Sequence, residues 1–389
     1  MPPNILLLGG DADHNLGDQA ILSSMCRALR KLHPGATLAV VSADKSRSAR
    51  YADADILRPG LFGLPALCAA AARSDLVLVG GGGLFQDDDS LIKMPYWAAR
   101  CLLMRLFCRR IIGYALGVGP LRAASSRLFA RLAFACMEQV TVRDPHAQRV
   151  AQPATGKTVE VVPDPAILIE PATADATRRW LDEHGVAVND KPLIGVAVRR
   201  WFPPRNRIVP QRVAAKVAPV VASPGRRSGA LIDALVAVLE EAIDRHDAKI
   251  LLLPTYNAGH EGDDRLCLEI QNRLPAGAAK VLHIDDPALY KGVAGQLALM
   301  LGGRMHPTIF AAAMATPIVG LAYNPKFHGF FELLDIPGRV MDVEAFVRQG
   351  KTKELAALIE QAFNDRDTLR QNSAALQERV DRFNRSLVT

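Results

Sequence analysis

The chain has 389 residues, of which 49% are hydrophobic and 22% charged, an ordinary globular composition that excludes a largely disordered chain. This length suits two domains, each long enough to bury its own core. The formal net charge of +7 favours anionic partners, but aromatic residues make up only 6% and no basic stretch has interleaved aromatics, so we expect no nucleic-acid binding.

The N-terminal residues, Met1 to Gly10, have no basic stretch, and their apolar run is too short for a secretory signal. No run of about 18 apolar residues follows, so we expect a cytoplasmic protein without a transmembrane segment. The six cysteines include no Cys-x-x-Cys pair and no histidine at zinc-ligand spacing. We therefore expect buried, reduced thiols and no metal or cofactor.

The first half of the chain alternates apolar strands with amphipathic helices. Residues 4–9 form a continuous apolar run that ends at glycine, which is typical of a strand covered on both faces. A helix is expected at 18–32 and a strand at 37–42. Further on, we expect strands at 75–79, 110–116, 139–142 and 159–162, and helices at 96–107 and 126–137. This alternation predicts a doubly wound parallel sheet with right-handed crossovers.

A polar stretch at 171–192, with a short helix around Trp180, predicts a linker, and a second α/β series follows it. Its expected strands are 193–198, 249–253, 280–283, 297–301 and 317–321. Its expected helices are near 230–246, 263–274, 287–294 and 306–314, and one or two more lie in the tail at 353–386. The predicted fold class is therefore α/β, with two Rossmann-like domains, 1–170 and 193–350, facing each other across a ligand cleft, and a helical tail at 351–389.

The first candidate site residues stand at the first strand-to-helix turn, in Asn15-Leu-Gly-Asp18. Gly17 permits a ligand to approach the backbone, and the helix start offers free N–H groups. Asp18 is suited to orient a sugar hydroxyl or to act as a base, and capping of the helix is an equally good interpretation. The turn lacks the Gly-x-Gly-x-x-Gly pattern, which disfavours NAD binding.

A second candidate follows the strand at 75–79, where four glycines precede Leu-Phe-Gln-Asp. Gly81 and Gly82 permit positive φ and close contact with a substrate, while Gln86, Asp87 and Ser90 are candidate polar contacts. No Lys-Ser/Thr pair follows, so this is not a nucleotide-triphosphate loop. A tight connection without a ligand is the alternative.

Further candidates cluster in the second half, where Gly303-Arg304-Met305-His306 joins a strand to a helix. Arg304 matches a carboxylate or phosphate bidentately, and His306 is a candidate proton donor. Arg199 ends the strand at 193–198 and would point to the same place. Lys326 is either a point charge for phosphate or a solvated surface lysine.

Two segments are harder to assign. His260 precedes two aspartates and would either contact a ligand or belong to a helix cap. Residues 203–229 carry six Lys and Arg side chains and no acidic one, in a stretch too long for an ordinary loop. A solvated loop and a site for an acceptor's phosphates or an anionic membrane are the two interpretations.

In order and spacing, these motifs resemble the polysaccharide pyruvyltransferase family, particularly its cell-wall polymer branch. The resemblance rests on Asn15–Asp18, Gly80–Asp87 with Ser90, Gly117–Pro120, Val142–Asp144, Asp164-Pro165, Gly303–His306 and Tyr323–Lys326. It implies a fold similar to GT-B glycosyltransferases, phosphoenolpyruvate as donor, and a pyruvate ketal on a sugar as product. It also implies that Arg199, Arg304 and His306 bind the donor.

Under this resemblance the acceptor is a glycan or a lipid-linked sugar, and peripheral contact with the inner face of the membrane stays open. His306 would protonate the donor, while Asp18 or Asp87 would accept a hydroxyl proton. The main alternative is a GT-B glycosyltransferase that uses a nucleotide sugar. A non-enzymatic module that binds polyanions through residues 203–229 is the second.

Overall fold

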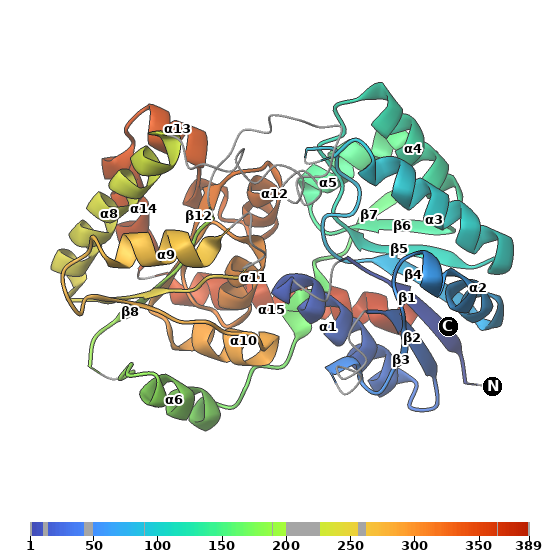
Figure 1. The fold of residues 1–389 in the computed structure, drawn as a ribbon, viewed down its shortest axis with the longest axis horizontal. Coiled ribbons are helices and arrows are strands. Elements are labelled where there is room, and N and C mark those ends of the chain that lie inside the picture. The colour runs from blue at the N-terminus through green and yellow to red at the C-terminus, as the bar shows by residue number, and fades with distance from the viewer. Residues whose placement is uncertain are drawn as a thin grey trace. The chain divides into compact units, whose positions relative to one another are not determined.

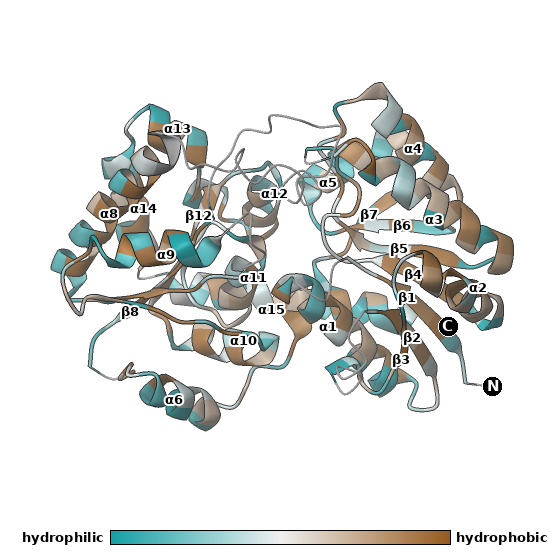
Figure 2. Ribbon diagram, in the orientation of Figure 1, coloured by the Kyte–Doolittle hydropathy of each residue, from teal (hydrophilic) through white to brown (hydrophobic). Residues whose placement is uncertain are grey.

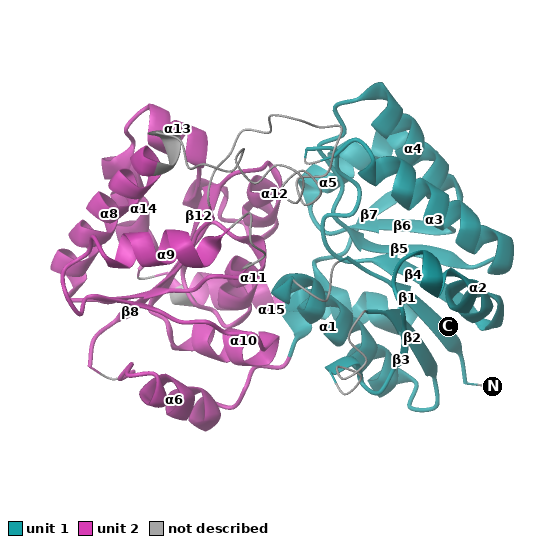
Figure 3. Cartoon of the chain, in the orientation of Figure 1, with its two compact units in different colours: residues 1–169, 204–217, 376–389 teal, residues 170–203, 218–375 magenta. Residues whose placement is uncertain are grey.

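A computed structural model describes residues 2–10, 15–42, 50–88, 90–188, 190–199, 226–255, 262–363 and 365–387. These residues divide into two compact units, which Figure 3 colours separately. The first unit contains the described residues through Ile169 and those from Leu376 onward, and the second contains the described residues between Glu170 and Ala375. Of the basic segment at 203–229 the structure describes only the part from Arg226, and His260 lies outside the described residues.

The first unit is built on a parallel sheet of seven described strands in the order β3-β2-β1-β4-β5-β6-β7 (Figure 1). The strands are β1 (Asn4–Leu8), β2 (Thr37–Val41), β3 (Asp55–Leu57), β4 (Leu76–Gly80), β5 (Ile111–Leu116), β6 (Gln139–Val142) and β7 (Val159–Val161). The helices are α1 (Leu16–Leu32), α2 (Leu64–Arg73), α3 (Lys93–Phe107), α4 (Ala124–Ala135) and α5 (Pro145–Ala151), with 3-10 turns η2 (Leu61–Gly63), η3 (Gln152–Ala154) and η4 (Pro165–Leu168).

The second unit repeats the plan with six described strands in the order β10-β9-β8-β11-β12-β13. They are β8 (Leu193–Ala197), β9 (Lys249–Leu252), β10 (Ala279–Val281), β11 (Leu299–Gly302), β12 (Ile318–Ala322) and β13 (Val340–Asp342). The helices are α6 (Ala174–Glu183), α8 (Arg226–His246), α9 (Asp263–Gln271), α10 (Pro287–Gln296), α11 (Met305–Ala313), α12 (Lys326–Leu333), α13 (Val343–Arg348) and α14 (Thr352–Ala362), with η6 at Pro337–Arg339. Helix α15 (Arg366–Ser386) belongs to the second unit through Ala375 and to the first unit from Leu376.

Both sheets are parallel throughout, and their central strands are apolar on both faces (Figure 2). Residues 5–8 of β1 and all of β8 are buried, because helices cover both sides of each sheet. In the first unit the chain leaves β1 toward β2 and later leaves β4 toward β5, in the opposite direction. The neighbouring strands β1 and β4 therefore form a topological switch point, and β8 and β11 form one in the second unit.

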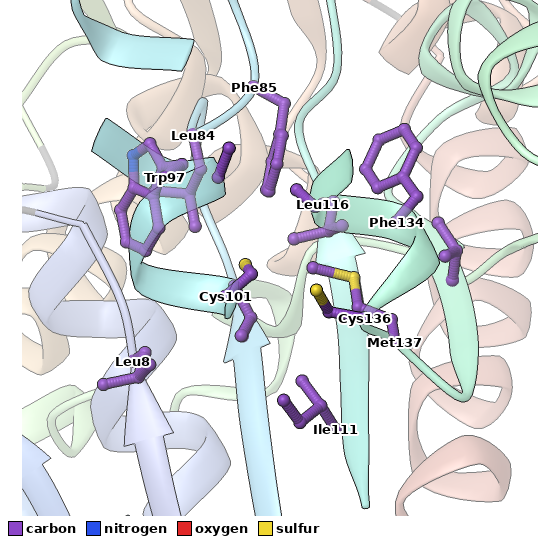
Figure 4. Packing of buried hydrophobic residues seen from close by; sticks show 14 of the residues in the cluster. Leu8, Leu84, Phe85, Trp97, Cys101, Ile111, Leu116, Phe134, Cys136 and Met137 are labelled. Atoms are coloured by element: carbon purple, nitrogen blue, oxygen red, sulfur yellow. The ribbon is translucent and has the colours of Figure 1, made fainter. Parts of the chain in front are cut away.

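Aromatic and sulfur-containing side chains fill the core of the first unit (Figure 4). The rings of Phe85 and Phe134 lie 5.2 Å apart between centroids, and Cys101 and Cys136 pack below them. Burial raises the pKa of the Cys101 thiol to about 12, which makes it an unreactive apolar group. Within the described residues, no helix combines the length and apolar character needed to cross a bilayer.

The predicted alternation of strands and helices and the two parallel α/β sheets are confirmed. The sequence patterns missed β3 and β13, because a three-residue edge strand is too short to show a period. They also missed α2, whose alanine-rich sequence gives little polar contrast. Lys326 is the first residue of α12.

Candidate functional site

In the first unit, the candidate residues gather where β1, β4 and β5 end. Gly10 follows β1, and Gly81 and Gly82 follow β4. A Cβ atom built on Gly10 would lie 2.5 Å from Oδ2 of Asp18, and one built on Gly82 would lie 2.5 Å from Oδ1 of the same carboxylate. The Asp18 carboxylate therefore packs directly against the backbone of both turns, at the switch point where doubly wound sheets bind ligands.

The cap of α1 is Asn15 and not Asp18, which corrects the capping interpretation. The Asn15 side chain accepts a hydrogen bond of 2.9 Å from the Gly17 N–H. Asp18 stands in the first helical turn and is partly exposed. Its negative charge is favourable there because the helix dipole is positive at this end.

The glycine turn has the conformation that the sequence predicts. Gly81 and Gly82 have φ values of 73° and 74°, in the left-handed region where side chains are strained. The Gln86 amide folds back over Gly83, so that its Oε1 would lie 2.7 Å from a Cβ there. The turn thus combines open backbone with one amide and one carboxylate, which is a suitable set of groups for sugar hydroxyls.

Asp87 and Ser90 are buried and hold backbone in place. Asp87 is fully buried, and its Oδ2 accepts a hydrogen bond of 2.8 Å from the N–H of Ala123. Ser90 Oγ accepts one of 3.2 Å from the N–H of Ile92. Both contacts fix the loops that flank the glycine turn.

A second buried cluster in the first unit contains no candidate residue. Arg143 Nη1 lies 3.3 Å from Asp164 Oδ2, and its Nε lies 3.5 Å from Asp144 Oδ2. Both aspartates also cap helical turns, accepting from Ala147 and Ala166. Burial raises the pKa of the Asp144 carboxyl, and Arg143 opposes this rise. The trio therefore fixes the ends of β6 and β7.

In the second unit, the candidate cations follow the three strands at and beside the switch point. Arg199 follows β8, Arg304 follows β11 and Lys326 follows β12. Tyr323, also after β12, lies among them. The Arg199 guanidinium carbon is 4.3 Å from the centre of the Tyr323 ring, and Lys326 Nζ is 4.9 Å from it. The structure therefore brings the predicted cations together around one phenol.

The pKa of the Tyr323 hydroxyl reflects the positive electrostatic potential that Arg199, Arg304 and Lys326 create around it. Burial alone would raise the pKa of its hydroxyl, but Lys326, Arg199 and Arg304 outweigh burial and lower the pKa to about 8. A hydrogen bond from Lys326 contributes in the same direction. A site that stabilises a phenolate also stabilises other anions.

Arg304 is held by a partner that the sequence did not indicate. Its Nε donates to Asp263 Oδ2 at 2.9 Å, and its Nη2 donates to Asp263 Oδ1 at 2.5 Å. Asp263 is completely buried at the start of α9, and the Arg304 side chain is only 13% exposed. The bidentate pair fixes the plane of the guanidinium but also neutralises part of its charge.

His306 is the second residue of α11 and is partly exposed. Arg304, the residue at the helix cap, has extended backbone angles, and no side chain caps the helix. A helix start without a side-chain cap presents N–H groups and a partial positive charge to an anion. The segment thus offers a titratable ring beside an anion-binding helix end.

Tyr323 and Asp263 are the two residues whose roles sequence reasoning missed. Tyr323 belongs to the motif Tyr323–Lys326, and its position three residues before Lys326 was the signal that could have indicated its role. Asp263 lies 41 residues before Arg304, and no pattern links two residues at such a separation.

The second unit also has a hollow that contains none of the candidate site residues. A hollow of about 570 Å³ in the second unit opens at the amino ends of β8 and β9 and is lined by Asp182, Lys191, Lys249 and Gly277 among others. It lies at the sheet edge opposite Arg199. Within the described ranges, no group of three or more His, Cys, Asp and Glu side chains is arranged to hold a metal ion.

Solved structures share this architecture at low sequence identity. UDP-GlcNAc 2-epimerase from Methanocaldococcus jannaschii matches with a TM-score of 0.60 and 13% identity, over 96% of this chain and 99% of that one. A glycosyltransferase from Rickettsia africae ESF-5 matches at 0.59 and 11%, over 98% and 96%. ADP-heptose LPS heptosyltransferase II from E. coli matches at 0.50 and 15%, over 92% and 99%. The fold is therefore GT-B-like.

Comparison with curated proteins finds no match by sequence. The family model described as polysaccharide pyruvyl transferase matches residues 15–325, which include the described candidate residues of both units except Lys326.

Proposed function

The chain belongs to the polysaccharide pyruvyl transferase family, and we propose that it moves the pyruvyl group of phosphoenolpyruvate onto a sugar, forming a ketal and releasing phosphate. The observation that carries this proposal is the group of three cations around Tyr323 at the switch point of the second unit. A small donor with one carboxylate and one phosphate needs compact, fixed positive charge. Among the described residues, Arg199, Arg304 and Lys326 bring fixed positive charge together at the carboxyl ends of the central strands of the second unit.

We assign donor binding to the second unit. Arg199 and Lys326 supply charge from β8 and β12, and the start of α11 supplies backbone N–H groups. Arg304 contributes a guanidinium whose orientation Asp263 sets. Tyr323 acts as a positioning residue, because its ring is in contact with both Arg199 and Lys326. His260, which lies outside the described residues, remains a candidate contact.

We assign acceptor binding to the first unit, through Asn15, Gly17, Gly81, Gly82 and Gln86. Because Ser90 is buried and accepts from the Ile92 N–H, its contact with the acceptor stays a prediction. For the base we favour Asp18, since its carboxylate is partly exposed and lies against both glycine turns. Asp87 was the other candidate base. Its full burial and its bond to Ala123 fit a supporting role better, and a catalytic role for it stays a prediction.

The proposed chemistry balances without a further reactant. His306 gives a proton to C3 of phosphoenolpyruvate, which becomes a methyl group and leaves C2 electrophilic. One sugar hydroxyl adds to C2 and loses its proton to Asp18. A second hydroxyl of the same sugar then displaces phosphate from C2 and closes the ketal. Of the two hydroxyl protons, one replaces the proton given by His306 and the other leaves with phosphate.

We propose a cell-wall polysaccharide or an exopolysaccharide, or its lipid-linked precursor, as acceptor, and a cytoplasmic location for the enzyme. The test is phosphate release from phosphoenolpyruvate with a panel of glycan acceptors, with products identified by mass spectrometry. Phosphoenolpyruvate alone should also raise the melting temperature, since a ligand of the native state stabilises it. A rise with UDP-sugars and none with phosphoenolpyruvate would favour a nucleotide-sugar transferase and refute the proposal.

Variants separate binding from turnover. His306→Gln should lower kcat by about 10²–10⁴-fold with little change in KM for the donor. Lys326→Met should mainly raise that KM. The matched control is His328→Gln, because His328 is in the same unit and pairs with Asp342 at 2.9 Å on an exposed surface. If His306→Gln and His328→Gln are equally active, His306 is not the acid.

A further inference from the structure

The exposed apolar side chains of the described residues are concentrated on one part of the first unit. Among the residues that the structure describes, every large hydrophobic side chain that is exposed lies between Leu61 and Leu132, with the exception of Leu268. The most extreme are Phe62, at 91% exposed, and Leu106, at 79%. Single exposed apolar residues are ordinary, but a concentration of them marks an interaction surface.

These side chains belong to one helical layer. The connections β3–α2–β4, β4–α3–β5 and β5–α4–β6 all step across the sheet in the same direction, so right-handed crossovers place α2, α3 and α4 on one face. Helix α3 packs between α2 and α4 (Figure 1). Leu102 and Leu106 on α3, and Leu128 and Leu132 on α4, are four residues apart and therefore form outward stripes. We call this surface the α2–α4 face.

One edge of the α2–α4 face adjoins the candidate acceptor site. Helices in such a fold begin where strands end, so the starts of α2 and α3 lie at the carboxyl edge of the sheet. The exposed Leu61, Phe62, Ile92 and Tyr96 stand at or just before these starts. The glycine turn after β4 and Asp18 lie at the same edge of the sheet.

The charge of this layer is entirely positive. Residues 91–137, which contain α3 and α4, carry eight Lys and Arg residues and no Asp or Glu. Arg105 and Arg131 are exposed beside the leucine stripes. Acids flank this stretch on both sides: Asp87–Asp89 precede it in the sequence, and Glu138 follows it and lies 3.7 Å from Arg110.

Exposed apolar groups beside the exposed cations Arg105 and Arg131 select one class of partner. A second copy of the chain would bring two sets of like charges together, and a soluble polyanion would not require exposed leucine and phenylalanine. An anionic lipid surface offers both an apolar interior for the side chains and negative headgroups for the arginines. We propose that the α2–α4 face docks on an anionic phospholipid membrane.

Docking in this way would bring the acceptor edge of the sheet to the bilayer, so the acceptor would be a lipid-linked sugar; this last step rests on the proposed pyruvyl transfer. The docking itself does not, and can be tested without donor or acceptor. Failure of one proposal is therefore distinguishable from failure of the other.

The test is co-sedimentation of the full chain with phosphatidylcholine vesicles, with and without about one-third phosphatidylglycerol. Wild type should bind the anionic vesicles only, and less as salt screens the headgroups. Arg105→Glu with Arg131→Glu should weaken binding by at least about fivefold for each cation removed. Leu106→Gln with Leu132→Gln should also abolish most binding, whereas Leu268→Gln on α9 should have no effect.

Control measurements on the same variants test folding and oligomeric state. All four positions are exposed, so the variants should keep the wild-type circular dichroism spectrum and melting temperature. Binding that survives both double variants would overturn the proposal. So would a concentration-dependent dimer, seen by light scattering and lost in Leu106→Gln with Leu132→Gln, since that result would assign the face to self-association.

Discussion

Removal of either member of the Asp263–Arg304 pair should destabilise the second unit strongly. Asp263→Leu leaves a guanidinium, itself 13% exposed, without the carboxylate that it contacts through two hydrogen bonds. Arg304→Met leaves a fully buried carboxylate without its cation. Breaking a buried pair in this way costs about 3–5 kcal/mol. Because the Arg304 side chain is partly exposed, solvent lowers the cost of an unpaired charge, and we expect a loss of about 3 kcal/mol.

A loss of about 3 kcal/mol corresponds to a fall in melting temperature of about 6–12 °C for a domain of this size. The double variant Asp263→Leu with Arg304→Met should recover most of that loss, because apolar groups replace both charges. It should not recover donor affinity, because the guanidinium is gone. Differential scanning fluorimetry measures the stability, and the KM for phosphoenolpyruvate measures the donor affinity.

The reasoning depends on coupling between the two residues, so the double-mutant cycle is decisive. If the two single losses simply add in the double variant, to within about 0.5 kcal/mol, the pair is not energetically coupled and the argument is refuted. If the double variant binds phosphoenolpyruvate as well as wild type, Arg304 supports the fold alone and the donor site consists of the remaining cations.

Three further predictions follow from the geometry. Donor affinity should fall in wild type as pH rises through about 8, because ionised Tyr323 neutralises the cations around it, and this fall should be absent in Tyr323→Phe. Since that pKa lies below the ordinary value of 10, wild type should also gain stability relative to Tyr323→Phe between about pH 8 and 10, as followed by melting temperature and phenolate absorbance. Arg143→Met should cost about 3–5 kcal/mol, because it strands two buried carboxylates, and acidification should restore part of the loss; an equal loss at all pH values would contradict this account. Gly82→Ala should raise the KM for the acceptor and leave that for the donor unchanged, because a Cβ there would displace the Asp18 carboxylate. Unchanged acceptor kinetics would show that Asp18 and the turn do not act together.

Much of the fold was predictable because it depends on local patterns. Apolar runs such as residues 5–8 and 193–197 can be buried on both faces only in a parallel sheet covered by helices. Glycine marked the turn after β4, since few other residues adopt φ near 73°. It also marked the turn after β1, where a Cβ on Gly10 would lie against the Asp18 carboxylate. Arg199, Arg304 and Lys326 were recognisable because each follows an apolar strand, where the chain must emerge at one edge of the sheet.

What the sequence could not determine depends on contacts between distant segments. The approach of Tyr323 to Arg199, the burial of Asp263 against Arg304, and the assignment of residues 376–387 to the first unit each join parts of the chain with no shared period. The same holds for the α2–α4 face, because its cations are visible in the sequence but the exposure of its leucines is not. Periodicity shows that a side chain lies on one face of a helix, whereas only packing of all the elements decides which faces are covered and which charges meet.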